Sequence, residues 1–192
     1  MLTERNYIDS ANLLGCEIAT IKAVAEVEGS GSGFFKDGTV KILFEPHVFW
    51  KRLKVYGLNP TDYVQGNEDI LYPVWGTKNY PIDSKIRYEQ LNRAKGINII
   101  AAYESCSWGI FQIMGFNAKP AGYNDAISMS RLFAMGEEHH LSGFCKYIIS
   151  QHLDDELRLK SWKQFARAYN GEQYFKHQYD IKLEKAYLKY KS

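Results

Sequence analysis

The stretch AEVEGSGSGFF, residues 25–35, decides the fold, because a helical pattern ends there in a run of glycine and serine. Apolar residues recur on one helical face through residues 17–28, at about 100° per residue, which predicts a helix. Three glycines and two serines then break the pattern. Residues 34–44 contain two short apolar runs around Asp37-Gly38, which predicts a β-hairpin.

Two glutamates lie near the end of this predicted helix, but on different faces of it. Glu28 follows Ile21 by seven residues and Val24 by four, so it lies within the apolar stripe. Glu26 points to the opposite side, four residues after Lys22, as in an ordinary exposed ion pair. We therefore interpret Glu26 as a solvated charge and Glu28 as a carboxyl group at a position that should be buried.

Two effects are expected to act on Glu28. Partial burial disfavours the charged form of a carboxyl group, and the negative end of the helix dipole does the same. Both effects raise the pKa, which suits a general acid working near neutral pH. The alternative is a glutamate that turns out to solvent as the helix end frays, since a perturbed carboxyl group indicates function only statistically.

A second carboxyl group, Glu45, follows 17 residues later, between the predicted second strand of the hairpin and a helix that begins at Pro46. A helix N-terminus favours negative charge, so the pKa of Glu45 is expected to stay low. Two carboxyl groups shifted in opposite directions are typical of glycoside cleavage, with one acid and one base or nucleophile. A simple helix cap is the alternative for Glu45.

Length and composition indicate one globular domain. The chain has 192 residues with 24 basic and 22 acidic side chains, a balance that argues against nucleic acid as a partner. Three widely spaced cysteines predict reduced thiols and show no metal-binding pattern. The first ten residues lack the apolar run of a secretory signal, and no stretch approaches the roughly 20 apolar residues of a membrane span.

The remaining chain is predicted to be mostly helical, with glycines marking the helix ends and a long ordered loop at residues 57–82. The expected helices cover residues 4–14 and 17–28, a segment from Pro46, and residues 84–95, 97–105, 109–114, 126–135, 137–152, 161–169 and 176–189. The predicted fold class is mainly α, with one small β-hairpin around residues 34–44.

Two later segments complete a recognisable order of motifs: SCSWGIFQIMG (105–115) and ARAYNG (166–171). A helix ending in Glu-Gly-Ser, then Gly-apolar-apolar-Gln, then Tyr-Asn-Gly resembles the lysozyme-like superfamily, which includes goose-type lysozymes and lytic transglycosylases. The closer resemblance is to the phage-type N-acetylmuramidases of endolysins from phages that infect Gram-negative bacteria. Its segments are VEGSGSGF (27–34), KILFEPHVF (41–49), SWGIFQIMGFN (107–117), FARAYNG (165–171) and YDIKLEKAY (179–187).

The resemblance implies a single lysozyme-like catalytic domain over residues 1–192, without a separate peptidoglycan-binding module. The implied reaction is cleavage of the β-1,4 bond between N-acetylmuramic acid and N-acetylglucosamine. Glu28 matches the family's catalytic glutamate, and Glu45 matches its second acidic residue. No metal and no cofactor are implied.

The resemblance also implies a set of residues that contact the glycan along the floor and wall of a cleft. These substrate-binding residues are Ser107, Trp108, Gln112, Tyr169 and Asn170. Simpler interpretations remain for most of them. Trp108 fits an apolar core cluster, Ser107 fits a cap of a short helix at Trp108, and Tyr169 and Asn170 fit a helix C-terminus before Gly171. Gln112 is less easily explained, because a buried amide must find hydrogen-bond partners.

The implied partner is the glycan strand of peptidoglycan, and the protein is expected to act as a monomer without stable insertion into a membrane. An endolysin of this kind is made in the host cytoplasm and reaches the wall after a holin-like partner permeabilises the membrane. Two rival functions remain at this point. One is a lytic transglycosylase that forms 1,6-anhydro products, and the other is a non-catalytic glycan-binding or phage structural module.

Two charged segments are expected to have no catalytic function. Residues 137–140, EEHH, lack the four-residue histidine spacing of a helical zinc site and are interpreted as a solvated helix start. Residues 174–192 contain five lysines against Asp180 and Glu184. This second segment is interpreted as a solvated helix face, with binding to a polyanionic surface as the alternative.

Overall fold

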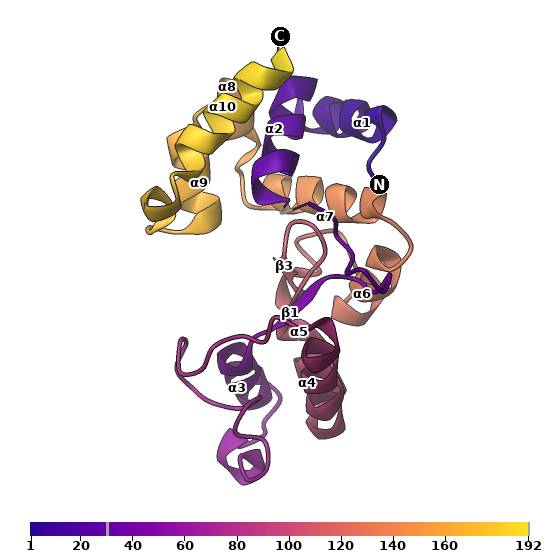
Figure 1. Cartoon of the computed structure of the whole chain (residues 1–192), viewed down its shortest axis with the longest axis vertical. Helices are drawn as coiled ribbons and strands as arrows, with labels where there is room; N and C mark the ends of the chain where they lie inside the picture. Colours follow the sequence, from indigo (N-terminus) through magenta and orange to yellow (C-terminus); the bar gives the residue numbers. More distant parts are fainter. Residues whose placement is uncertain (30, 192) are drawn as a thin grey trace.

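A computed structural model describes residues 1–29 and 31–191; Ser30 of the glycine-rich stretch and Ser192 lie outside it. Figure 1 shows two groups of helices joined through a small sheet, with both labelled chain ends in the upper group. The upper group consists of α1 (Glu4–Leu14), α2 (Ile18–Glu28), α7 (Glu137–Ser150), α8 (Asp154–Leu159), α9 (Trp162–Asn170) and α10 (Tyr179–Lys191). The lower group consists of α3 (Pro46–Val55), α4 (Ser84–Ile97) and α5 (Ile99–Glu104), and α6 (Ala126–Phe133) lies beside the sheet.

The mainly α fold predicted from the sequence is confirmed, and most predicted helices lie within a few residues of their expected bounds. Local signals explain this agreement. Thr3 and Asn6 form a capping box at the start of α1, and Gly15 ends that helix in the left-handed conformation at φ 65°. The short helix α8 was not predicted. No helix within the described ranges is long and apolar enough to cross a membrane.

The sheet differs from the predicted hairpin. Asp37-Gly38 does form a turn, with one bridge between Phe34 and Val40. The strand β1 (Ile42–Phe44), however, pairs antiparallel with β2 (Cys106–Trp108), which in turn pairs with β3 (Ile113–Met114). The hairpin prediction was therefore right about the turn and wrong about the partner of β1, because strand pairing across about 60 residues leaves no local signal.

The helix predicted at residues 109–114 is wrong. This segment is the turn between β2 and β3, together with β3 itself. Gly109 has φ 72° and Gln112 has φ 48°, and neither angle fits a right-handed helix. The apolar residues Ile110, Phe111 and Ile113 are buried from this turn, so their spacing reflects the core and not a helix.

The start of α7 is buried, which corrects the prediction of a solvated helix start at residues 137–140. The Glu137 carboxylate accepts hydrogen bonds from the Gly33 amide at 2.7 Å and from the Ser32 hydroxyl at 3.1 Å. Only 6% of Glu137 is exposed. These bonds lower the pKa of Glu137 against the opposing effect of its burial, so the ionised carboxylate is the form that anchors this bend.

His140 anchors the second turn near the sheet. Its Nδ1 accepts a hydrogen bond from the Ile110 amide at 3.2 Å, and its Nε2 donates to the Phe133 carbonyl at 2.9 Å. The ring is fully buried and lies so close to the chain that a Cβ built on Gly33 or Gly109 would meet it within 3 Å. One helix, α7, thus fixes both the bend after α2 and the turn between β2 and β3.

We expect His140→Ala to lower the free energy of unfolding by about 3 kcal/mol, because it leaves a cavity and two buried backbone groups without partners. Urea denaturation followed by circular dichroism measures this change. The matched control is His139→Ala, because the His139 side chain makes no hydrogen bond within residues 1–29 and 31–191. This substitution should change stability by less than about 0.5 kcal/mol. Equal effects of the two substitutions would contradict the anchoring function of His140.

Candidate active site

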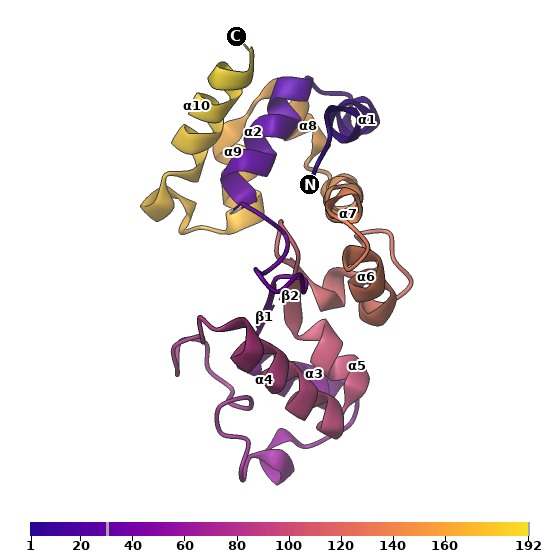
Figure 2. The same cartoon turned by 45° about the vertical axis from the view of Figure 1, so that its right-hand side comes forward.

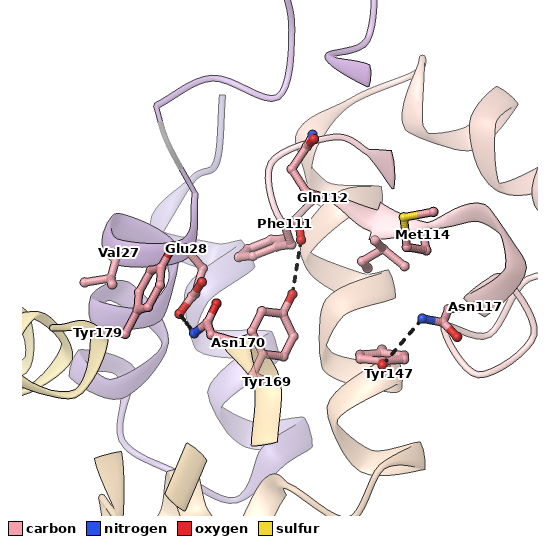
Figure 3. A pocket seen from close by; sticks show the side chains of 11 residues that line it. Val27, Glu28, Phe111, Gln112, Met114, Asn117, Tyr147, Tyr169, Asn170 and Tyr179 are labelled. Atoms are coloured by element: carbon pink, nitrogen blue, oxygen red, sulfur yellow. Dashed lines mark hydrogen bonds between the residues drawn. The ribbon is translucent and has the colours of Figure 1, made fainter. Parts of the chain in front are cut away.

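A cavity of about 530 Å³ opens between the end of α2, the turn before β3, α7, α9 and the start of α10. Figure 3 shows the side chains that surround it. They are Val27, Glu28, Phe111, Gln112, Ile113, Met114, Asn117, Tyr147, Tyr169, Asn170 and Tyr179. Four of the residues predicted from the sequence, Glu28, Gln112, Tyr169 and Asn170, are therefore brought together here.

Glu28 is the last residue of α2, and its half-buried carboxyl group faces this cavity. Burial raises its pKa above the ordinary value, as predicted. Two smaller effects oppose this increase: a hydrogen bond from Asn170 and the positive charge of Lys182. A carboxyl group in this environment holds its proton to a higher pH than an exposed glutamate does.

Asn170 is the direct partner of this carboxyl group. Its Nδ2 donates a hydrogen bond to Glu28 Oε1 at 2.9 Å (Figure 3). Asn170 is the last residue of α9, which ends at Gly171 with φ 82°. The C-terminal position predicted for residues 169–171 is thus confirmed, and this position also turns the Asn170 amide toward Glu28.

Tyr169 supports the cavity wall and does not hydrogen-bond the glutamate. Its hydroxyl donates to the Phe111 carbonyl at 3.1 Å, and its ring stacks on Phe165 with centroids 5.6 Å apart. Burial raises the pKa of Tyr169 well above its ordinary value, and the nearby charge of Glu28 raises it further. Tyr169 therefore stays neutral and ties α9 to the turn that carries Gln112.

The amide of Gln112 is held at both ends. Ser107 Oγ donates to Gln112 Oε1 at 2.8 Å, and Gln112 Nε2 donates to the Gly109 carbonyl at 2.8 Å. A primary amide has two N–H donors, so one N–H of Gln112 makes no hydrogen bond to the residues that the structure describes. Ser107 lies in strand β2, which corrects its predicted helix cap. It does not line this cavity, and its direct contact with substrate stays a prediction.

Trp108 belongs to the core. It is 3% exposed, its ring stacks on Tyr103 at 5.6 Å between centroids, and its Nε1 donates to the Tyr103 carbonyl at 3.1 Å. It does not line the cavity that contains Glu28. The core interpretation of Trp108 thus fits the structure, and its contact with substrate stays a prediction.

Glu45 lies outside the cavity that contains Glu28. It is the N-cap residue of α3, but its side chain makes no capping hydrogen bond. Instead, the Tyr80 hydroxyl donates to Glu45 Oε2, and His47 Nδ1 lies 3.4 Å from the same oxygen. Burial raises the pKa of Glu45 in spite of the Tyr80 hydrogen bond, so the predicted low pKa is wrong. The two glutamates do not form a pair within this cavity.

Several residues of the cavity wall were not predicted from the sequence, among them Asn117, Tyr147 and Tyr179. Asn117 Nδ2 approaches the Tyr147 hydroxyl at 3.5 Å across the end opposite Glu28. Burial raises the pKa of Tyr179, and so does the charge of Glu28, which places this ring beside the carboxyl group. Tyr179 is the first residue of the segment YDIKLEKAY, which is part of the family resemblance, so this residue could have been identified from the sequence. Tyr147 lies in an ordinary helical apolar pattern, which does not distinguish it from a core residue.

Comparison with known proteins identifies the family to which a chain with this fold and cavity belongs. A family model of N-acetylmuramidases matches residues 17–191. The chain belongs to the N-acetylmuramidase family. The solved structures include the crystal structure of Burkholderia AP3 phage endolysin, which superimposes with a TM-score of 0.91 at 33% sequence identity. That match covers 99% of this chain and 71% of the endolysin chain. A search of curated protein sequences finds no match.

Family and fold together support a peptidoglycan hydrolase, and the resemblance drawn from the sequence motifs is confirmed at this level. The matched range contains the whole cavity wall, from Val27 to Tyr179. This N-acetylmuramidase fold thus holds one carboxyl group of raised pKa in its cavity, with a side-chain amide bonded to it.

We expect Asn170→Ala to raise the pKa of Glu28, because the hydrogen bond from Asn170 stabilises the charged carboxylate. A ¹³C NMR titration of the Glu28 carboxyl carbon measures the change. Asn117→Ala is the matched control, since Asn117 lines the same cavity without a bond to Glu28. An unchanged or lower pKa in Asn170→Ala would contradict this description of the site.

Proposed function

We propose that the protein hydrolyses the β-1,4 bond between N-acetylmuramic acid and N-acetylglucosamine, with Glu28 as the general acid. The observation that carries the proposal is the half-buried carboxyl group of Glu28, whose burial raises its pKa, in the wall of the cavity. A general acid must be protonated in the substrate complex, and a raised pKa increases the fraction of the carboxyl group that is protonated at a given pH. Protonation of the glycosidic oxygen then allows the bond to the sugar carbon to break.

Asn170 has two functions in this proposal. Its N–H holds the Glu28 carboxyl group in one orientation before the reaction. The same hydrogen bond stabilises the carboxylate that forms once the proton has left. The free N–H of Gln112 is the donor proposed for a sugar hydroxyl or acetamido oxygen, because the turn holds this amide rigidly.

We propose that Glu45 takes no part in proton transfer. Among the described residues, Glu28 is the one carboxyl group that lines the cavity, so its ionised form is also the base available to activate water. Glu45 instead accepts a hydrogen bond from the Tyr80 hydroxyl and fixes the end of the long loop between α3 and α4. This assignment replaces the base or nucleophile function that the sequence pattern suggested for Glu45.

A lytic transglycosylase is the second candidate, and the single carboxyl group in the cavity favours it. Such an enzyme needs one acid, because the 6-hydroxyl of the muramic acid residue attacks its own ring and leaves a 1,6-anhydro sugar. Mass spectrometry of the soluble products from purified peptidoglycan separates the two reactions. Reducing N-acetylmuramic acid ends support the hydrolase, and 1,6-anhydro ends would assign the transglycosylase instead.

We expect Glu28→Gln to lower wall-cleaving activity by roughly 10²- to 10⁴-fold, which is the usual contribution of a general acid. We expect Glu45→Gln to retain activity within about tenfold, since the new amide oxygen still accepts the Tyr80 hydroxyl. Turbidity clearance of purified cell walls measures both variants. Equal loss in both variants would restore the paired-carboxylate mechanism.

Binding of the inactive variant tests the remaining rival, a glycan-binding module. Sedimentation with insoluble peptidoglycan should show that Glu28→Gln still binds the wall while it no longer cleaves it. A native protein that binds the wall with no cleavage at all would support the module and overturn the enzyme. Circular dichroism of both proteins serves as the control for folding.

The biological setting that we propose is host lysis by a phage, with the polymeric wall as substrate and a holin-like protein opening the membrane. The similarity to the AP3 phage endolysin supports this setting. We propose that the protein acts as a monomer on single glycan strands.

A further inference from the structure

A second cavity, of about 380 Å³, lies along the surface between α2 and α10. Its lining comprises Glu26 and Val27 from α2 with Lys182, Lys185, Ala186 and Lys189 from α10. We call this set of six residues the lysine groove. Val27 also lines the cavity that contains Glu28, so the groove starts at the edge of the active site (Figure 3). Figures 1 and 2 show α2 and α10 side by side in both views.

The lysine groove has an excess of positive charge. Lys182, Lys185 and Lys189 recur at three- and four-residue spacing, which places them on one face of α10. The single carboxylate of the lining, Glu26, forms an ion pair with Lys189 at 2.6 Å. Glu26 thus balances one of the three ammonium groups.

Lys182 and Lys185 lie nearer the active site and have no carboxylate among the lining residues to balance them, so this end of the groove is positively charged. Lys182 is one turn from Tyr179, which lines the cavity of Glu28, and its ammonium group lies 5.6 Å from the centroid of that ring. Lys182 also lowers the pKa of Glu28 through its charge, which shows that the groove and the acid are electrostatically coupled. Lys182 and Lys185 are both exposed to solvent and accessible to a ligand.

We propose that the lysine groove binds the anionic peptide stem carried by the muramic acid residue next to the cleaved bond. This proposal rests on the function proposed above, because that function brings a peptide-bearing sugar to Glu28. Each stem carries free carboxylates, and the groove offers ammonium groups at the edge of the cavity in which we propose that the sugar binds. The stem thereby adds binding free energy that a bare glycan strand lacks.

A solvated helix face and a surface for anionic lipids are the competing explanations of the same lysines. The position of the groove favours the stem, because Val27 belongs to both cavities and the lysines begin one turn from Tyr179. A membrane-binding face needs no such continuity with the active site.

The test compares two substrates in a Lys182→Gln/Lys185→Gln variant: intact peptidoglycan, and the same glycan strands after an amidase has removed the stems. We expect kcat/KM on the stem-bearing substrate, relative to kcat/KM on the bare strands, to fall roughly fivefold or more. The change in the pKa of Glu28 that follows the loss of Lys182 acts on both substrates and does not alter this ratio. The preference of the native protein for stems should also weaken as the salt concentration rises, because exposed charges are screened.

Matched variants separate binding from the electrostatic effect on the acid. Lys185 is not among the groups that shift the pKa of Glu28, so Lys185→Gln should weaken the stem preference without moving the pH profile. Lys182→Gln should do both, and the pKa of Glu28 should rise. A Lys85→Gln/Lys163→Gln variant has the same change in net charge away from both cavities and should leave the preference intact.

Two results would overturn the proposal. One is an equal loss on both substrates, which would assign the lysines to the glycan or to general catalysis. The other is unchanged kcat/KM on both substrates, which would show that the lysines belong to a solvated helix face. If the native protein cleaves neither substrate, the proposed function is wrong, but this result does not contradict stem binding by the lysine groove. NMR titration with a free stem peptide would then decide, since shifts confined to α10 and α2 support binding and their absence contradicts it.

Discussion

Two backbone turns that are far apart in the sequence meet at α7, and the hydrogen bonds they make there organise the active site. Glu137 holds the amide of Gly33, in the bend that follows Glu28, and His140 holds the amide of Ile110, in the turn that carries Gln112. Both α7 side chains are buried, so a lost bond would leave an unsatisfied buried polar group, which is costly. The relative position of the acid and the Gln112 turn therefore depends on this one helix.

Burial of one carboxyl group gives the site its chemistry. Glu28 continues the apolar stripe of α2, so the packing that forms the helix bundle also removes water from the carboxyl group. Asn170 and Lys182 limit the resulting rise in pKa, and both come from the C-terminal third of the chain. The fold thus combines a raised pKa with a polar partner that holds the proposed proton donor in place.

Local patterns predicted most of the helices and the partial burial of Glu28, because helix caps and apolar spacing act within a few residues. The errors concern groups whose environment is set by distant parts of the chain. Glu45 is half-buried and accepts a hydrogen bond from Tyr80, which lies 35 residues later in a loop without periodicity. The segment around Gln112 adopts a left-handed turn because it pairs with strands and contacts α7, and its apolar composition alone resembled a helix.

A crystal structure of the Glu28→Gln variant with a bound peptidoglycan oligosaccharide would test the central claim most directly. The account predicts that a glycosidic oxygen lies within hydrogen-bond distance of the new amide at position 28, with Asn170 beside it. A saccharide bound instead over Tyr80 and Glu45, with no glycosidic oxygen near residue 28, would contradict the assignment of Glu28 as the general acid.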